Sequence, residues 1–348
     1  MKRIVDRGMW IVDRRTWNVD VHNPQSTIHN PLIGVLLCAL LLALCGCGGE
    51  KKKLIAVVPK ATSHIFWVSV QAGAFSAGRE FGVDVLWNGP TQETEYDRQI
   101  QIVDSLVARR VDGLAVAAAE RKALVGSIDR AVRAGIPVVV FDSGVDSTNY
   151  MTFLATNNYE AGRMGAHTLA GLLGGRGKVA VVMHAPGSFS TMERERGFED
   201  VIGKEYPNIR IVGRQFGMAD PAKSRAAAEN ILTANPDLDG LFASTEPSST
   251  GASLALKSRG LSGKVKFVAF DFSDSMIANL KGGTIHAMVV QDPFRMGYEV
   301  VKTLVDKLHG KTPPKRIDLS PRVVRKPDLE KSEIQTLLYP DIKKYLNR

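Results

Sequence analysis

From Leu54 onward, short runs of apolar residues alternate with longer segments in which apolar residues recur at helical spacing. The first run covers residues 54–58, and the helical pattern over 66–82 ends on a glycine, a common stop signal for a helix. Buried strands that alternate with helices are typical of parallel sheets covered on both faces, so we predict an α/β fold. The predicted strands cover residues 54–58, 83–87, 112–117, 136–142, 178–183, 209–213, 239–244, 264–271 and 284–291.

The alternation restarts near Asn157, so the chain contains two blocks of similar size. Each block is predicted to form a doubly wound lobe around a parallel sheet, and such sheets bind ligands beyond the carboxyl ends of their strands. Many residues at the predicted strand ends are polar, and if the two lobes face each other these ends meet in one cleft. The residues at these ends are Lys60, Ala117, Asp142, Ser143, His184, Thr245, Glu246, Asp271, Gln291 and Asp292.

The N-terminal region carries an export pattern. An apolar run over residues 32–44 is too short to span a bilayer comfortably, but it suits the core of a secretory signal peptide. The three cysteines of the chain, Cys38, Cys45 and Cys47, all lie in or just after this run. The residues around Cys47 resemble the bacterial lipobox, in which a small residue, here Gly46, precedes the cysteine that is lipidated.

We therefore predict that residues 1–46 are a leader and lipoprotein signal peptide and that residues 47–53 form a tether. Only Cys47 would remain after processing, so no disulfide within the chain and no cysteine metal site are expected. Two or more acyl chains hold a protein firmly on a membrane. The expected location is the periplasm or cell envelope, with the protein anchored by lipid.

The composition is ordinary for a globular protein, with 44% hydrophobic and 23% charged residues. The net charge is +9, but the basic residues are dispersed and form no stripe with aromatic residues, so nucleic acid is not an expected partner. The glycine-rich stretch at 174–178 lacks the glycine spacing and the Ser/Thr of a phosphate loop. No nucleophile and base are paired by a motif. We predict no enzyme activity, no cofactor and no metal site.

Seven stretches occur in the order of a known family: PKATSHIFWVSVQAGA, AGIPVVVFDS, TNNYEAG, STMERERGFED, NPDLDGLFAS, VKFVAFD and VVQDPFRMGYEVV. On these stretches the chain resembles the periplasmic sugar-binding proteins of ABC transporters, of the ribose-binding type. The resemblance implies the type I periplasmic binding protein fold, with two lobes joined by a three-stranded hinge. It implies an N-terminal lobe of residues 54–156 plus 292–320 and a C-terminal lobe of residues 157–291 plus 321–348. LacI-type repressors share these lobes, but the export signal stands where they carry a helix-turn-helix.

The resemblance also implies residues that contact the sugar. Phe66 and Trp67 stand where the family stacks aromatic rings on the sugar, and we expect one of the two to be a core residue. Asp142 and Asp271 are implied acceptors for sugar hydroxyls, because carboxylates make strong hydrogen bonds. The alternative for both aspartates is that they cap helices.

Arg194 matches the arginine of the family that binds the sugar, and its planar fork suits adjacent hydroxyls. Its neighbour Arg196 is the alternative, although we expect that residue at the surface or hinge. Gln291 is the implied amide ligand beside the hinge.

The chain departs from the ribose-binding pattern at several positions. The pattern has asparagine where His64, Ala117 and Thr245 stand, and a stacking phenylalanine near Ala219. Because several residues that bind hydroxyls are changed, ribose is not assigned as the ligand. His64 and Thr245 remain candidate ligand residues.

A second branch, which binds autoinducer-2 or rhamnose, is similar in the stretches VVPK, WNGPT and QFGMADPAKS. In that branch Lys60 would join the site; whether Lys60, His64 and Glu246 face the cleft stays open at this stage. Our prediction is a lipid-anchored solute-binding protein that captures a monosaccharide and delivers it to an ABC permease. The alternatives are an autoinducer-2 or rhamnose-type binding protein and a sensory sugar-binding lipoprotein that signals to a membrane receptor.

Overall fold

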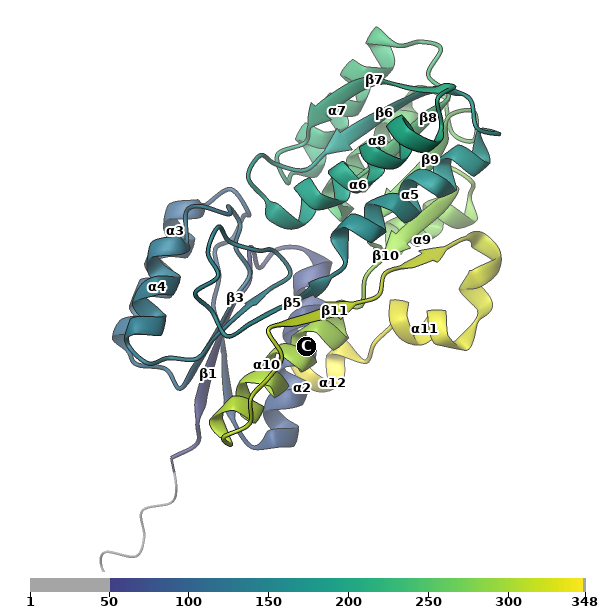
Figure 1. Cartoon of the computed structure of the whole chain (residues 1–348). Helices are drawn as coiled ribbons and strands as arrows, with labels where there is room; N and C mark the ends of the chain where they lie inside the picture. The colour runs from purple at the N-terminus through teal and green to yellow at the C-terminus, as the bar shows by residue number, and fades with distance from the viewer. Residues whose placement is uncertain (1–50, 347–348) are drawn as a thin grey trace, which may run out of the picture. The chain divides into compact units, whose positions relative to one another are not determined.

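The computed structural model describes residues 51–346 and contains two six-stranded sheets (Figure 1). The first sheet consists of β1 (Leu54–Val58), β2 (Asp84–Trp87), β3 (Gly113–Val116), β4 (Val138–Phe141), β5 (Thr152–Thr156) and β11 (Arg316–Leu319). The second consists of β6 (Gly177–Met183), β7 (Ile209–Phe216), β8 (Gly240–Ala243), β9 (Lys266–Phe270), β10 (Ala287–Val290) and β12 (Arg322–Val324). The strand orders are β11-β5-β4-β3-β1-β2 and β12-β10-β9-β8-β6-β7. Both orders are doubly wound, which confirms the predicted α/β fold class.

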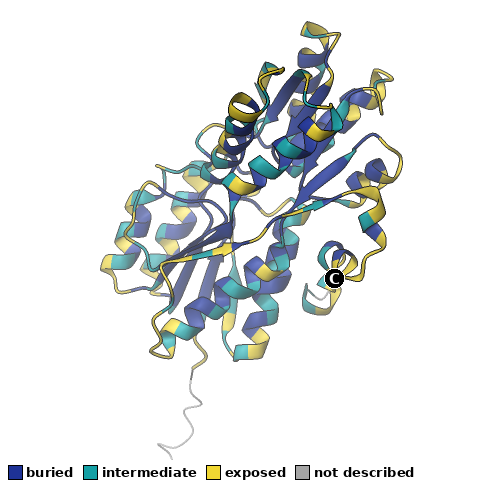
Figure 2. Cartoon of the chain, turned by 45° about the vertical axis from the view of Figure 1, so that its right-hand side comes forward, coloured by how far each residue is buried: buried dark blue, intermediate teal, exposed yellow. Residues whose placement is uncertain are grey.

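Helices cover both faces of each sheet, and the strands between them are largely buried (Figure 2). In the first lobe, α2 (Ile65–Phe81) and α10 (Pro293–Leu308) cover one face, while α3 (Tyr96–Ala108) and α4 (Val125–Arg133) cover the other. In the second lobe, α5 (Asn158–Leu172) and α6 (Phe189–Glu205) cover one face. The opposite face packs on α7 (Pro221–Ala234), α8 (Glu246–Ser258), α9 (Asp274–Lys281) and α11 (Ser332–Leu338). Continuous apolar strands such as β4 are the expected result of burial on two faces.

Paired glycines set a close approach of two helices in each lobe. A Cβ atom on Gly73 of α2 would lie 1.9 Å from the carbonyl oxygen of Phe294, and one on Gly297 of α10 would meet Val70 at the same distance. Gly162 and Gly197 make the equivalent contact between α5 and α6. Any larger residue at these positions would push the helices apart.

The chain passes between the two sheets three times. It leaves the first sheet after β5, returns between β10 and α10, and leaves again between β11 and β12. The strand β12 pairs antiparallel with β10, whereas the other strand pairs are parallel. These crossings place the carboxyl ends of both sheets beside the hinge.

The end of the chain differs from the predicted lobe boundaries. The resemblance implies that residues 321–348 belong to the C-terminal lobe, and α11 does pack in the core of that lobe through Ile334 and Leu338. However, the short helix α12 (Ile342–Leu346) lies on the N-terminal lobe, where the Arg79 guanidinium donates hydrogen bonds to the carbonyl oxygens of Lys344 at 2.7 Å and Tyr345 at 3.0 Å. The final carbonyls of a helix have no partner within the helix, so an arginine from α2 can hold it there.

The predicted leader, signal peptide and lipidated Cys47 lie outside the described residues. Within residues 51–346, no helix combines the length and the apolar character needed to cross a bilayer.

Candidate functional site

Two aspartates stand at equivalent strand ends in the two lobes. Asp142 follows β4 and Asp271 follows β9, and both have left-handed backbone conformations, with φ of 56° and 63°. Their backbone N–H groups donate to Leu154 at 2.9 Å and Val289 at 2.8 Å, which ties each turn to the neighbouring strand. A left-handed conformation is costly for most residues other than glycine, although aspartate adopts it more readily than most, and residues held in it cluster at functional sites. Neither aspartate is the N-cap of a described helix, so the alternative capping role is not observed.

A cavity of about 40 Å³ lies between the two lobes at these strand ends. All nine predicted ligand residues line it: Lys60, His64, Phe66, Trp67, Asp142, Arg194, Thr245, Asp271 and Gln291. The volume is sufficient for water but small for a sugar ring, because side chains of the two lobes bond to one another across it. Contact of these residues with a ligand stays a prediction, but the structure brings them together.

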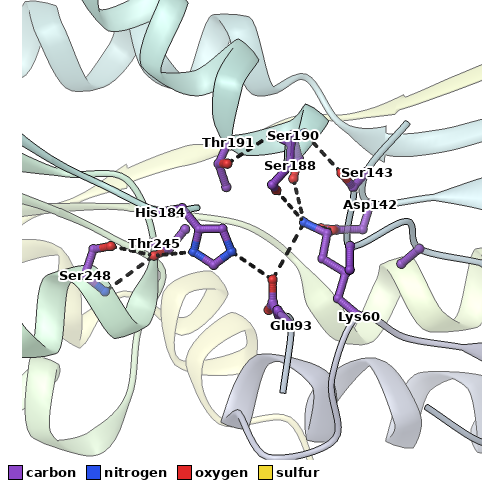
Figure 3. Close-up of polar contacts among 12 residues, drawn as sticks. Lys60, Glu93, Asp142, Ser143, His184, Ser188, Ser190, Thr191, Thr245 and Ser248 are labelled. Atoms are coloured by element: carbon purple, nitrogen blue, oxygen red, sulfur yellow. Dashed lines mark hydrogen bonds and ion pairs between the residues drawn. The ribbon is translucent and has the colours of Figure 1, made fainter. Parts of the chain in front are cut away.

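Lys60 lies at the centre of the bonds that cross the cleft (Figure 3). Its ammonium group, on the N-terminal lobe, donates to the hydroxyls of Ser188 and Ser190 on the C-terminal lobe, both at 3.0 Å. It also forms ion pairs with Asp142 at 3.2 Å and Glu93 at 3.9 Å. With only 3% of Lys60 exposed, these partners offset much of the cost of burying its charge.

Glu93 forms a second link across the cleft. Its Oε1 accepts a hydrogen bond from the indole N–H of Trp67 at 3.0 Å, and its Oε2 accepts one from Nε2 of His184 at 2.9 Å. Burial opposes ionisation of this carboxyl, but His184 and Lys60 together hold its pKa well below the usual range. Burial lowers the pKa of His184 in turn, against the opposing effect of Glu93.

Arg194 is the largest charged side chain in the buried interior of the C-terminal lobe. Its guanidinium donates to the carbonyl oxygen of Ser244 and, at 2.7 Å, to the side-chain oxygen of Asn158. Its central carbon lies 3.5 Å from the centre of the Phe270 ring, a close cation–π contact. The guanidinium is therefore held in position by three protein groups, the Ser244 carbonyl, the Asn158 side chain and the Phe270 ring.

Asp271 and Gln291, which both line the cavity, form a hydrogen-bonded pair. The amide nitrogen of Gln291 donates to Oδ1 of Asp271 at 2.7 Å. Burial raises the pKa of Asp271 to about 6, although Arg194 and Gln291 both favour its ionised form. In its ionised form, which Arg194 and Gln291 favour, this carboxylate is a hydrogen-bond acceptor.

Two buried polar atoms on the cavity residues have no hydrogen-bond partner among the described residues. They are Nε of Arg194, which is a donor, and Oε1 of Gln291, which is an acceptor. Buried polar groups nearly always have partners, so such atoms need an explanation. A ligand that carries hydroxyl groups can both donate to the amide oxygen and accept from the guanidinium.

The two predicted aromatic residues differ in their environment. Trp67 is almost fully buried and packs against Phe141, with ring centres 6.3 Å apart. Phe66 is half-buried and meets the Trp67 ring edge-on at 5.0 Å. Both reach the cavity, but Trp67 also belongs to the apolar core, as expected for one of the two.

Several residues singled out from the sequence lie elsewhere or were missed. Arg196 is exposed and bonds to Glu193, as expected of a surface residue. Ala117 and Ala219 do not line the cavity. The sequence interpretation did not select six cavity residues as ligands: Glu93, His184, Ser190, Thr191, Glu246 and Pro247. His184 and Glu246 stood at predicted strand ends and could have been chosen on that signal.

Glu195 is a buried glutamate that bonds to His184, which lines the cavity, and to Ser244. Oε1 of Glu195 accepts hydrogen bonds from the backbone N–H of His184 at 3.0 Å and from the Ser244 hydroxyl at 2.8 Å. Burial raises the pKa of Glu195 from 4.5 to about 7, against the effect of these two hydrogen bonds. Glu195 therefore positions His184 and the Ser244 carbonyl that binds Arg194.

This raised pKa predicts a pH-dependent stability. A carboxyl whose pKa is higher in the folded state favours folding fully below about pH 4.5, and this contribution is lost as the pH rises through 7. A shift of this size corresponds to about 3 kcal/mol. Glu195→Gln should therefore gain about that much unfolding free energy relative to the wild type between pH 4.5 and 8, measured by urea unfolding. Glu205→Gln, on the exposed end of the same helix, is the matched control; equal pH profiles for Glu195→Gln and wild type would contradict the assignment.

Within residues 51–346, no cluster of three or more histidine, cysteine or acidic side chains has the geometry to hold a metal ion. The cavity instead combines carboxylates, an ammonium, a guanidinium, an amide and aromatic rings. This set can exchange water for hydrogen bonds to a polar, neutral ligand.

Comparison with known proteins identifies the family. A sequence profile of the periplasmic binding protein domain matches residues 55–312. The chain belongs to the periplasmic binding protein family. This periplasmic binding protein is 27% identical to the ribose import binding protein of Bacillus subtilis over 270 residues, which cover 78% of this chain and 86% of the relative.

Two solved structures are similar to this periplasmic binding protein over most of its length. One is a carbohydrate transporter solute-binding protein from Agrobacterium radiobacter in complex with D-arabinose, with a TM-score of 0.81 and 31% identity. The other is an ABC transporter solute-binding protein from Agrobacterium vitis with bound D-fucose, with a TM-score of 0.80 and 34% identity. They cover 84% and 82% of this chain, and all of each matched chain is covered. These relatives are binding proteins, which confirms the predictions of a type I periplasmic binding protein fold and of a protein that is not an enzyme.

Proposed function

We propose that this protein is a solute-binding protein of an ABC transporter that holds a neutral monosaccharide in the cleft between its lobes. The observation that carries the proposal is the pair of buried atoms without partners, Nε of Arg194 and Oε1 of Gln291, beside the carboxylate of Asp271. A donor, an acceptor and a carboxylate on residues that line the cavity match the donor and acceptor character of sugar hydroxyls. The two similar solved structures contain D-arabinose and D-fucose, which supports a monosaccharide as the class of ligand.

The charges of the cavity favour a neutral ligand over an anionic one. Four carboxylates line the cavity: Glu93, Asp142, Glu246 and Asp271. The two cations of the lining, Lys60 and Arg194, already bond to protein oxygens. A sugar phosphate or sugar acid would bring a further negative charge to a site in which carboxylates outnumber cations, at a cost in desolvation.

The aromatic residues complete the proposed site. Phe66 would pack on the C–H face of the sugar ring, while Trp67 is held in place by the core and by Glu93. Stacking on the aromatic ring would supply apolar contact, and the polar side chains would fix the orientation of the sugar, as is usual in small-molecule sites. His64 and Thr245 line the cavity and are proposed as further hydroxyl partners.

The proposal includes a membrane anchor and a transport partner. The protein would be lipidated on Cys47, tethered to the membrane in the periplasm or cell envelope, and would present its closed form to an ABC permease. The lipobox pattern around Cys47 supports the anchor, and membership of the family supports the transport role. A sensory lipoprotein that signals to a membrane receptor would use the same cleft.

One observation favours the second candidate, an autoinducer-2 or rhamnose-type binding protein. Lys60, which that branch adds to the site, is buried and lines the cavity. Arg194 and Asp271 fit the monosaccharide-binding pattern better, so a monosaccharide remains the leading proposal.

Thermal melting with matched neutral and anionic ligands tests the proposal. A neutral sugar at 100 times its dissociation constant should add about 2.7 kcal/mol to the unfolding free energy. The panel pairs D-ribose with D-ribose 5-phosphate and D-glucose with D-glucuronate, and adds D-arabinose, D-fucose, rhamnose and autoinducer-2. We expect a shift with at least one neutral sugar and none with its anionic counterpart. A shift with autoinducer-2 alone would replace the leading proposal with the second.

A further inference from the structure

Glu93 lies on a loop that hydrogen bonds within the N-terminal lobe hold in place. The loop follows β2, and Oε2 of Glu95 accepts hydrogen bonds from the backbone N–H groups of Thr91 at 2.8 Å and Gln92 at 3.1 Å. The hydroxyl of Ser63, next to the first turn of α2, donates to the carbonyl oxygen of Thr91 at 3.0 Å. The position of Glu93 is thus set by the N-terminal lobe itself.

One oxygen of the Glu93 carboxylate bonds within the N-terminal lobe, and the other contacts both lobes. Figure 3 shows the contacts of Glu93 with His184 and Lys60. Oε1 accepts from Trp67 of its own lobe at 3.0 Å, and Oε2 accepts from His184 of the other lobe at 2.9 Å. Lys60, at 3.9 Å from Oε2, adds an ion pair from the same lobe. Of these three partners, only His184 must separate from Glu93 when the lobes move apart.

We infer that Glu93 is a positioning residue that couples the aromatic side of the cleft to its closure. Through Oε1 it holds Trp67 in the open and closed forms, and through Oε2 it bonds to His184 only in the closed form. The inference rests on the proposed binding function of the cleft. It adds a residue whose role is to retain the ligand after closure rather than to select it.

The groups around the contact make it strong in the closed form. His184 is 2% exposed, and its other ring nitrogen lies 3.3 Å from the Thr245 hydroxyl, which fixes the ring plane. Hydrogen bonds to an ionised group in a site without bulk water are stronger than those between neutral groups. Burial lowers the pKa of His184, Glu93 opposes this effect, and the cations Lys60 and Arg194 lower the pKa further, so a neutral imidazole that donates through Nε2 fits the site.

A contact made only in the closed form acts mainly on ligand release. Loss of one such charge-assisted hydrogen bond should raise the dissociation rate constant about ten- to hundred-fold. The association rate constant should change by less than about three-fold, because the contact forms after the encounter. A merely structural role for Glu93 would lower the melting temperature without this division between the two rates.

Stopped-flow measurement of both rates tests the inference with D-arabinose, D-fucose and D-ribose as the probes. Glu93→Ala should show the faster release. Glu93→Gln keeps the shape and can still bond to Trp67, and it should show a smaller effect. Glu80→Gln, a carboxylate on α2 that bonds to Tyr298, is the matched control. Equal release rates for wild type and Glu93→Ala would overturn the inference, as would equal effects on both rates.

A readout without sugar separates this inference from the proposed function. The three cysteines of the chain lie before residue 50, so a protein that begins at Glu50 can be labelled at one introduced cysteine in each lobe, Arg133→Cys and Lys257→Cys. Distances between the two spin labels should lengthen in Glu93→Ala relative to Glu93→Gln and wild type. Unchanged distances would count against the role in closure even if sugar binding is found. Longer distances with no binding of any sugar would support the closure contact and reject the proposed ligand class.

Discussion

Arg194→Ala is expected to raise the dissociation constant for the bound sugar about a hundred-fold or more. The guanidinium is fully buried, is fixed by Ser244 and Asn158, and carries a donor that has no partner among the described residues. Truncation of one partner in a buried, hydrogen-bonded charge site typically costs 2–5 kcal/mol in binding. The loss also removes the cation that favours the ionised form of Asp271, so this carboxyl becomes a poorer hydrogen-bond acceptor.

Calorimetric titration with the sugar that gives the largest melting shift measures this effect. Arg196→Ala is the control. Arg196 lies two residues further along the same helix, α6, but it is exposed and bonds to Glu193 at the surface. Arg194→Lys retains the charge but not the planar fork, and we expect it to recover only part of the affinity. Binding by Arg194→Ala within a factor of three of the wild type would contradict the assignment of Arg194 to the ligand site.

Lys60→Met should lower the unfolding free energy by about 3–5 kcal/mol, because it leaves buried carboxylates without their cation. Asp142 lies 3.2 Å from the ammonium and Glu93 lies 3.9 Å from it, and all three side chains are at most about a tenth exposed. Two hydroxyls, of Ser188 and Ser190, lose their donor at the same time. The effect should therefore exceed that of any surface ion pair in the chain.

Urea unfolding of the ligand-free protein at pH 7 measures the loss. The control Lys302→Met removes the partly exposed pair with Asp306 and should cost less than about 1 kcal/mol. The double variant Lys60→Met/Asp142→Asn should recover part of the stability, because it also removes one of the two buried negative charges. If Lys60→Met and Lys302→Met destabilise the protein equally, Lys60 is not the buried link between the lobes.

The sequence predicted the strand-end residues well because one rule covers them. Apolar runs such as residues 138–141 mark buried strands, and the next residue, Asp142, must emerge at the carboxyl edge of the sheet. The same rule places Asp271 after β9 and Gln291 after β10. The two left-handed turns could not be predicted, since nothing in the local pattern requires a positive φ at an aspartate.

Glu93 escaped prediction because its place depends on contacts between loops far apart in the chain. The loop that carries it has no apolar periodicity, and it is held by hydrogen bonds to Thr62 and Ser63, about 28 residues earlier. Ser188 and Ser190 likewise gain their role only when the second lobe meets Lys60. Contacts across a cleft are set by the relative position of two lobes, which a one-dimensional pattern does not contain.

The position of the final helix, α12, likewise could not be predicted from the sequence pattern. Residues 342–346 are too few to display a periodic pattern, and their position depends on Arg79, which lies more than 260 residues earlier. The resemblance assigned this segment by order along the chain to the C-terminal lobe. The structure assigns it by its hydrogen bonds to the other lobe.

A crystal structure of the protein grown with the sugar that gives the largest melting shift tests the central claim most directly. The account predicts one sugar molecule in the cleft, with its hydroxyls bonded to Asp142, Arg194 and Asp271 and its ring packed on Phe66. It also predicts that Nε of Arg194 and Oε1 of Gln291 gain partners from the ligand. A sugar bound at another surface, or a cleft in which these atoms do not meet the sugar, would contradict the account.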